Sequence, residues 1–419
     1  MALDSITLGR RLREARENRN LTQEQAAQSI GVSRTALVHI ESGKRSLSTL
    51  ELSGLSKLYD RSAADFFVED EEGAGREADP LLILHRLPPE LLGVAEISRQ
   101  VSRCVELCSI GVRLERALGM QDVIDLPSYE QFVPSRQYWE ATRQGERVAE
   151  DERRRLGLGY GPIADMADLI STQGIWASGV QDLPDDMSGI FLRHASIGLV
   201  ILVNHGHPRA RKRFSYAHEY AHALLDRKAA SAIVSREQNR QEFIERRANA
   251  FAAAFLMPET GVRWFMDHLE KGGPSRRRRI TFSSAGDEPV ESEERPAPGS
   301  QRITYQDVVA LASHFGVSYP AATYRLSDLG LVDAQEKEAL LQRSSLGSRL
   351  LESMNDFDCD EQGRPPRKPD RELVSHIVRL AVEAYRREER SLGWIRDLSE
   401  KLGLPAEDLV EMAEAVAEG

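Results

Sequence analysis

Two histidines and a glutamate in this sequence have the types and the spacing needed to bind a metal ion. His218 and His222 are four residues apart, so a helix would place both imidazoles on one side, within reach of one ion. Glu245 follows on a second predicted helix, whose small residues allow close packing against the first. Two imidazoles and one carboxylate leave the fourth position of zinc open for water. We therefore expect Zn²⁺ as the cofactor, with these three residues as its ligands.

Glu219, which lies between the two histidines, is predicted to be the catalytic residue. Zinc would lower the pKa of a water molecule towards about 7, and Glu219 would accept its proton, so that hydroxide could attack a carbonyl group. Glu242, one turn before Glu245, is the alternative third ligand. In a chain without a metal site, Glu245 would instead pair with Arg246 or Arg247. The sequence does not select an oxyanion donor among four nearby side chains, Tyr216, Tyr220, His205 and His207.

The segments that carry these residues resemble the ImmA/IrrE family of metallopeptidases. The likeness rests on the runs 213–225 and 245–258, which hold both halves of the family's signature in order, and it spans roughly residues 80–260. The family usually has Leu and Gly where Tyr220 and Ala221 stand here, which leaves the predicted ligands and base intact. The resemblance implies the same ligands and base. It also implies cleavage of a regulatory protein such as a transcriptional repressor, in a stress response or a mobile-element switch.

Near the N-terminus, two short helices are predicted to meet at a glycine. Thr22 caps a helix that Gly31 ends, and Ser33 caps a second helix over residues 34–41. Residues 6–67 are similar to Xre/Cro-type helix-turn-helix domains, in which the second helix enters the major groove of double-stranded DNA. The resemblance implies contacts to bases or phosphates from Ser33, Arg34, Thr35 and His39, and contacts that hold the DNA backbone from Gln23, Lys44 and Arg45. A helical module that binds protein is the alternative for this region.

The charge distribution separates this N-terminal region from the rest of the chain. The 419 residues carry a net charge of −11, which argues against a chain that coats nucleic acid along its whole surface. Residues 1–67 hold ten Lys and Arg and eight Asp and Glu, a net charge of +2, so the remainder carries −13. We predict five regions: a helix-turn-helix domain (1–67), an acidic linker (68–79), a metallopeptidase domain (80–271), a flexible linker or insertion (272–300) and a helical C-terminal region (301–419).

The predicted fold class is mainly α with a small antiparallel sheet (α+β), in which a zincin-like body lies between the two helical regions. Short β-favouring runs at 175–177, 189–192 and 198–203 predict the sheet. Either the strand Leu199–Asn204, in which Val203 would dock the chain, or the strand Gly189–Leu192 is expected to present an edge to an extended peptide. Residues 303–326 predict a second helix–turn–helix, which is either a packed pair or another DNA-binding unit.

The remaining features concern the compartment and the partners. No apolar run approaches the ~20 residues that a membrane span needs, and no secretory signal is visible, so we expect a cytoplasmic protein. Cys104 and Cys108 are expected to be reduced core residues of a helix. The predicted function is that of a DNA-binding regulator with zinc-dependent endopeptidase activity, with double-stranded DNA and a protein substrate as partners and a homodimer left open. The alternative is a transcriptional regulator whose peptidase-like domain senses a ligand or metal without proteolysis.

Overall fold

The computed structural model describes residues 5–19, 21–59, 66, 95–120, 126–129, 137–194, 197–228, 232–239, 241–273, 277–282, 289–294, 299–358 and 370–417. Contacts divide the chain into two compact units. One comprises Met1–Ile124, His194–Gly198 and Asp370–Gly419, and the other comprises Asp125–Arg193 and Leu199–Pro369. The predicted acidic linker, residues 68–79, lies outside the described residues.

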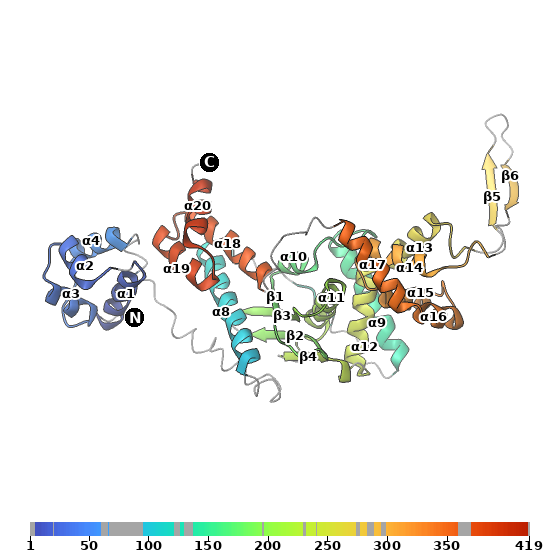
Figure 1. Cartoon of the computed structure of the whole chain (residues 1–419), viewed down its shortest axis with the longest axis horizontal. Helices are drawn as coiled ribbons and strands as arrows, with labels where there is room; N and C mark the ends of the chain where they lie inside the picture. Colours follow the sequence, from blue (N-terminus) through green and yellow to red (C-terminus); the bar gives the residue numbers. More distant parts are fainter. Residues whose placement is uncertain are drawn as a thin grey trace. The chain divides into compact units, whose positions relative to one another are not determined.

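The N-terminal domain consists of short helices around a small apolar core (Figure 1): α1 (Ser5–Asn18), α2 (Gln23–Ser29), α3 (Arg34–Glu41) and α4 (Thr49–Tyr59). Thr22 caps α2 in a capping box with Gln25, and Ser33 caps α3. Gly9 lets α1 cross α3 closely, because a Cβ atom there would lie 2.5 Å from the backbone oxygen of Ile40. The core is formed by Leu12, Ala15, Ala26, Ala27, Leu37, Ile40, Leu52, Leu55 and Tyr59.

Another group of helices in the same unit joins segments that are far apart in the sequence. Helix α8 (Ala95–Ala117) packs against α18 (Arg371–Arg386), which packs against α19 (Leu392–Leu402) and α20 (Ala406–Ala417). The side chain of Arg103 on α8 donates to Asp370 at 3.1 Å. Cys104 and Cys108 are buried, reduced residues of α8, as expected, and burial raises the pKa of Cys108.

The second unit contains a four-stranded sheet in the order β1-β3-β2-β4: β1 (Ile175–Val180), β2 (Met187–His194), β3 (Gly198–Asn204) and β4 (Ala232–Arg236). The expected fold class, mainly helical with one small sheet, is confirmed. The sheet is mixed rather than antiparallel, because β3 runs parallel to β1 while β4 runs antiparallel to β2. The intervening strand β2 forms part of the crossover that parallel neighbours require.

The strand order also corrects the predicted peptide-docking edge. Strand β3, which contains Val203, lies between β1 and β2, and β2 lies between β3 and β4. Neither strand therefore has an unpaired edge, and the edges of this sheet are β1 and β4. The alternating burial along β4 is typical of such an outer strand.

The second unit also contains these helices: α9 (Tyr138–Arg155), α10 (Met166–Ser171), α11 (Arg209–Leu225), α12 (Phe243–Leu256) and α13 (Glu259–His268). Helix α12 packs against both α9 and α11. Gly145 permits the close approach of α9, because a Cβ atom there would lie 2.3 Å from the backbone oxygen of Arg247. Helix α12 is thereby held on two sides, which restrains the side chains that it presents to α11.

Four further helices share this core: α14 (Tyr305–Phe315), α15 (Tyr319–Asp328), α16 (Ala334–Leu341) and α17 (Ser344–Asp358). Arg325 on α15 is buried, donates to the backbone oxygen of Met257 at 3.0 Å and pairs with Glu146 at 2.6 Å. These contacts favour the packed-pair interpretation of residues 303–326.

Within the predicted flexible segment 272–300, strands β5 (Arg277–Phe282) and β6 (Pro289–Glu294) form an antiparallel hairpin. Among the described helices, none is both long and apolar enough to cross a membrane. The domain limits expected from the sequence stay predictions.

Candidate metal centre

Helices α11 and α12 bring His218, His222 and Glu245 together. The two histidine Nε2 atoms lie 3.2 Å apart. The Glu245 carboxylate lies 3.1 Å from Nε2 of His218 and 3.5 Å from Nε2 of His222. Ligands on a tetrahedral zinc ion with bonds of about 2.0–2.1 Å are separated by roughly 3.3–3.4 Å. The three donors therefore have the chemistry and the mutual spacing that fit one zinc ion.

Polar groups behind the histidines fix which nitrogen faces the site. Nδ1 of His222 donates to Asp226 at 2.8 Å, and Nδ1 of His218 donates to the Asn249 side-chain oxygen at 3.1 Å. Arg247 donates in turn to Asp226. With Nδ1 of each ring engaged, each Nε2 atom is directed at Glu245, which is the orientation that metal-binding histidines adopt.

The supporting roles of Asp226 and Asn249 were not predicted from the sequence. A signal was present for both residues. Asp226 is four residues after His222, and Asn249 is four residues after Glu245, so each lies one helical turn beyond a candidate ligand. That Arg247 pairs with Asp226, however, depends on how the two helices pack.

Burial and charge shift the titration of these groups. Burial lowers the pKa of His222, but its hydrogen bonds to Asp226 and Glu245 outweigh this and raise the pKa to about 10. Burial raises the pKa of Glu245, and the hydrogen bonds from His218 and His222 overcome that effect and bring it to about 2. Without a metal, a protonated imidazole thus compensates the buried carboxylate, so a metal ion would compete with protons for this site.

Glu219 differs from its neighbours because it forms no ion pair within the described part of the chain. It is 0% exposed, and neither carboxylate oxygen has a hydrogen-bond partner there. Gly189 on β2 makes room for it, since a Cβ atom at that position would lie 2.6 Å from Glu219 Oε1. Burial raises the pKa of Glu219, against the opposing effects of His218, His222 and the nearby Ser235 hydroxyl.

The N-terminal domain places most of its predicted DNA contacts on one exposed segment. Ser33 precedes α3, its hydroxyl accepts from the backbone N–H of Ala36, and the next residues begin the helix. The backbone N–H groups of Lys44 and Arg45 bond to the His39 oxygen, which folds the following turn back onto α3. The exposed residues are Ser33, Arg34, Thr35, His39, Lys44 and Arg45.

Two of the predicted DNA contacts are engaged within the domain. Gln23 is half-buried and donates to Glu41 at 2.8 Å, and Arg45 pairs with Glu51 at 2.8 Å. Glu41 also forms a buried ion pair with Arg16 at 2.6 Å. Gln23 is thus tied to the core network of this domain.

Two family models match the chain where these sites lie. A helix-turn-helix model matches residues 12–66, and a peptidase model described as an IrrE N-terminal-like domain matches residues 181–268. The second match includes all three candidate ligands and Glu219. The chain joins an Xre-like helix-turn-helix domain to an ImmA/IrrE-like domain.

No curated protein matches the chain. A solved structure of PlcR from Bacillus thuringiensis, in complex with the peptide PapR7 and DNA, is 14% identical, and the match covers 99% of this chain and 98% of that one. Its TM-score is 0.16, so this similarity carries no argument about the fold.

In the IrrE-like domain, the alternative third ligand and the arginines considered as partners of Glu245 form no ion pair with the proposed metal ligands in the described part of the chain. Glu242 occupies the N-cap position of α12 as an exposed residue outside the cluster of donors. Arg246 lies over the Tyr138 ring at 4.8 Å, and Arg247 pairs with Asp226, so neither arginine is the partner of Glu245 that was considered.

Of the four candidate oxyanion donors, two are engaged in the core. The Tyr220 hydroxyl donates to Glu152, and its ring packs against Phe251 and Phe255. Nε2 of His207 lies 3.1 Å from the Asp185 backbone oxygen. Tyr216 is buried on α11 and His205 follows β3, and their roles stay predictions.

Proposed function

We propose that the IrrE-like domain is a zinc-dependent endopeptidase that cleaves a regulatory protein, and that the helix-turn-helix domain binds double-stranded DNA. The observation that carries the proposal is the position of Glu219. A structural metal site needs ligands but no further carboxylate buried beside them without an ion-pair partner, and burying such a group is costly. A general base has to lie there.

The donor set supports zinc as the metal. His218, His222 and Glu245 would hold it, and Asp226 and Asn249 would keep the two imidazoles oriented. When bound, zinc would make water a stronger acid and polarise a peptide carbonyl. Glu219 would take the proton from the attacking water and pass it to the leaving amine.

Strand β4 is the proposed docking edge for the substrate. It is an outer strand, and its Ser235 pairs in the sheet with Gly189, the residue that lies against Glu219. An extended segment that added to β4 through main-chain hydrogen bonds would run close to the general base. This assignment replaces the interior strands expected from the sequence.

For the helix-turn-helix domain, the exposed start of α3 and the turn after it support DNA binding. Arg34 and Thr35 would face the major groove, and Lys44 would contact phosphate. We propose that this domain brings the peptidase to an operator or regulates a promoter.

A second function, sensing without proteolysis, is favoured by one observation. His218, Glu219, His222 and Glu245 are all at most 4% exposed. Such burial is typical of a closed structural site, whereas a catalytic one keeps a position open to substrate. In this alternative the domain would sense a ligand or the metal itself, without activating water for proteolysis.

The deciding experiment compares the wild type with Glu219→Gln. A candidate transcriptional repressor is incubated with each protein, and the metal content of both is measured. We expect the variant to keep about one zinc ion and to lose cleavage by about 10²–10⁴-fold, the usual contribution of a general base. Equal cleavage by both proteins would exclude Glu219 as the base. Full zinc content without cleavage of any candidate by the wild type would favour the sensor.

A further inference from the structure

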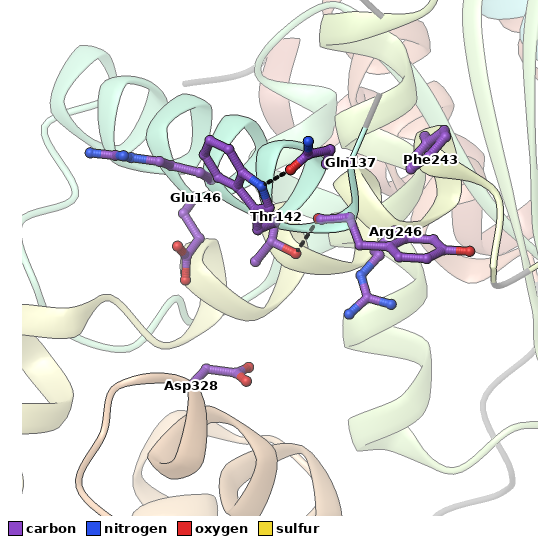
Figure 2. Close-up of a pocket in the computed structure, with 9 residues that line it drawn as sticks. Gln137, Thr142, Glu146, Phe243, Arg246 and Asp328 are labelled. Carbon is purple, nitrogen blue, oxygen red and sulfur yellow. Dashed lines mark hydrogen bonds between the residues drawn. The ribbon is translucent and has the colours of Figure 1, made fainter. Parts of the chain in front are cut away.

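An open hollow of about 920 Å³ lies between helices α9, α12 and the end of α15 (Figure 2). None of the proposed metal ligands or DNA contacts is among the residues that line it. Helix α12 contributes Phe243 and Arg246, which flank the proposed ligand Glu245 in the sequence. Glu245 is buried, whereas both flanking residues are exposed, so one turn of α12 serves the metal centre on one side and the hollow on the other. We call the hollow the α9–α12 surface.

Three aromatic rings of the α9–α12 surface are unusually exposed. Trp139 is 58% exposed, Tyr138 50% and Phe243 38%, and the rings of Tyr138 and Phe243 lie 5.2 Å apart. Exposed aromatic side chains gathered in one place mark interaction sites, because burying them against a partner removes much apolar surface from water at little cost in side-chain entropy. Tryptophan, tyrosine and arginine are also the residues that most often dominate binding at protein interfaces.

The charges of the surface indicate the sign of the partner. The Arg246 guanidinium lies over the Tyr138 ring, and Arg143 is exposed on the next turn of α9. Within the described part of the chain, neither guanidinium has a carboxylate within ion-pair distance. Glu146 is neutralised by the buried Arg325, which leaves Asp328 as the opposing charge. The hollow therefore offers two cations against one free carboxylate.

We propose that the α9–α12 surface docks an acidic segment of the protein substrate, with an aromatic side chain of that segment packed against Trp139 and Phe243. Arg246 is held by Tyr138 in a position to bind a carboxylate of the segment, and Arg143 adds a second positive charge. The role in substrate selection rests on the proposed peptidase function, whereas binding of the segment does not. Binding and cleavage are therefore measured separately.

The test uses the full-length protein and two labelled ten-residue peptides. Each peptide has one central phenylalanine, flanked by aspartate and glutamate in one and by lysine in the other, and binding is followed by fluorescence anisotropy. We expect the acidic peptide to bind, and Arg246→Gln and Trp139→Ala each to weaken it by about ten-fold, a typical effect of removing a dominant interface residue. Asp328→Asn is expected to strengthen binding, because it removes the opposing charge.

The matched controls are Arg263→Gln and Trp264→Ala, which alter an exposed arginine and an exposed tryptophan of α13. Both are expected to bind the acidic peptide like the wild type, and unchanged zinc content verifies folding in every variant. Equal or tighter binding of the lysine peptide would overturn the proposal, as would unchanged binding by both Arg246→Gln and Trp139→Ala. Absence of binding up to about 1 mM peptide would overturn it as well. Peptide binding without repressor cleavage would contradict the peptidase function alone.

Discussion

In the helix-turn-helix domain the buried charges of Arg16 and Glu41 compensate each other at 2.6 Å, whereas the buried Glu219 of the IrrE-like domain has no such partner in the described chain. Both domains bury carboxylates. Glu41 holds the helices of the helix-turn-helix domain together, whereas Glu219 of the IrrE-like domain is not engaged in an ion pair with any described residue. A buried charge with an ion-pair partner serves structure, and a buried carboxylate without one, beside a set of metal donors, indicates chemistry. Variants of each group can test this contrast.

The largest effect is expected from the proposed metal ligands. Changing His218, His222 or Glu245 to Ala removes one of only three protein donors, so most of the zinc should be lost from the purified protein. Metal analysis by mass spectrometry measures this. Glu242→Ala is the matched control, and loss of zinc in that variant with retention in Glu245→Ala would exchange the third ligand.

The buried ion pair of the helix-turn-helix domain should give the next largest effect. Arg16→Met leaves Glu41 buried without its cation, which typically costs about 3–5 kcal/mol of the free energy of unfolding. Amide hydrogen exchange of α1 to α3 in the full-length protein should accelerate, while zinc content stays unchanged. Arg16→Lys should recover part of the protection. If exchange in α1 to α3 is the same in Arg16→Met and the wild type, the pair does not stabilise this domain.

A smaller loss is expected when the support of a ligand is altered. Asp226→Asn keeps the size of the side chain but weakens its interaction with His222 and with Arg247, so zinc affinity should fall by about 10–100-fold. Competition with a chelator of known affinity measures the change. An effect as large as that of His222→Ala would instead make Asp226 a direct ligand.

Effects of similar size or smaller are expected at the DNA-binding surface, where single contacts are exposed. Lys44→Ala should weaken binding to all DNA sequences alike and lower the salt dependence by about one phosphate contact, whereas Arg34→Ala should cost about 1–3 kcal/mol of discrimination between sites. Gel-shift titrations at several salt concentrations, with the operator region of its own gene, separate the two. Binding that is indifferent to both changes would favour the protein-binding alternative for this domain.

The parts of the fold that could be predicted from the sequence depend on neighbours along the chain. Thr22 and Ser33 cap helices through backbone groups three residues away, and His218 and His222 share a helix face because of its period. Such features need no knowledge of tertiary packing. This is why the helix-turn-helix segment and the candidate metal donors were identified at their own residues.

Long-range packing decided the rest. Which strands form the edges of the sheet depends on the insertion of β3 between β1 and β2. The pairing of α8 with α18 joins Arg103 and Asp370, which are 267 residues apart in the sequence. Tyr220, a candidate oxyanion donor by its position, is held instead by Glu152 from α9. Local periodicity determines which face of a helix is apolar or polar, but the element that meets that face depends on how the whole core is filled.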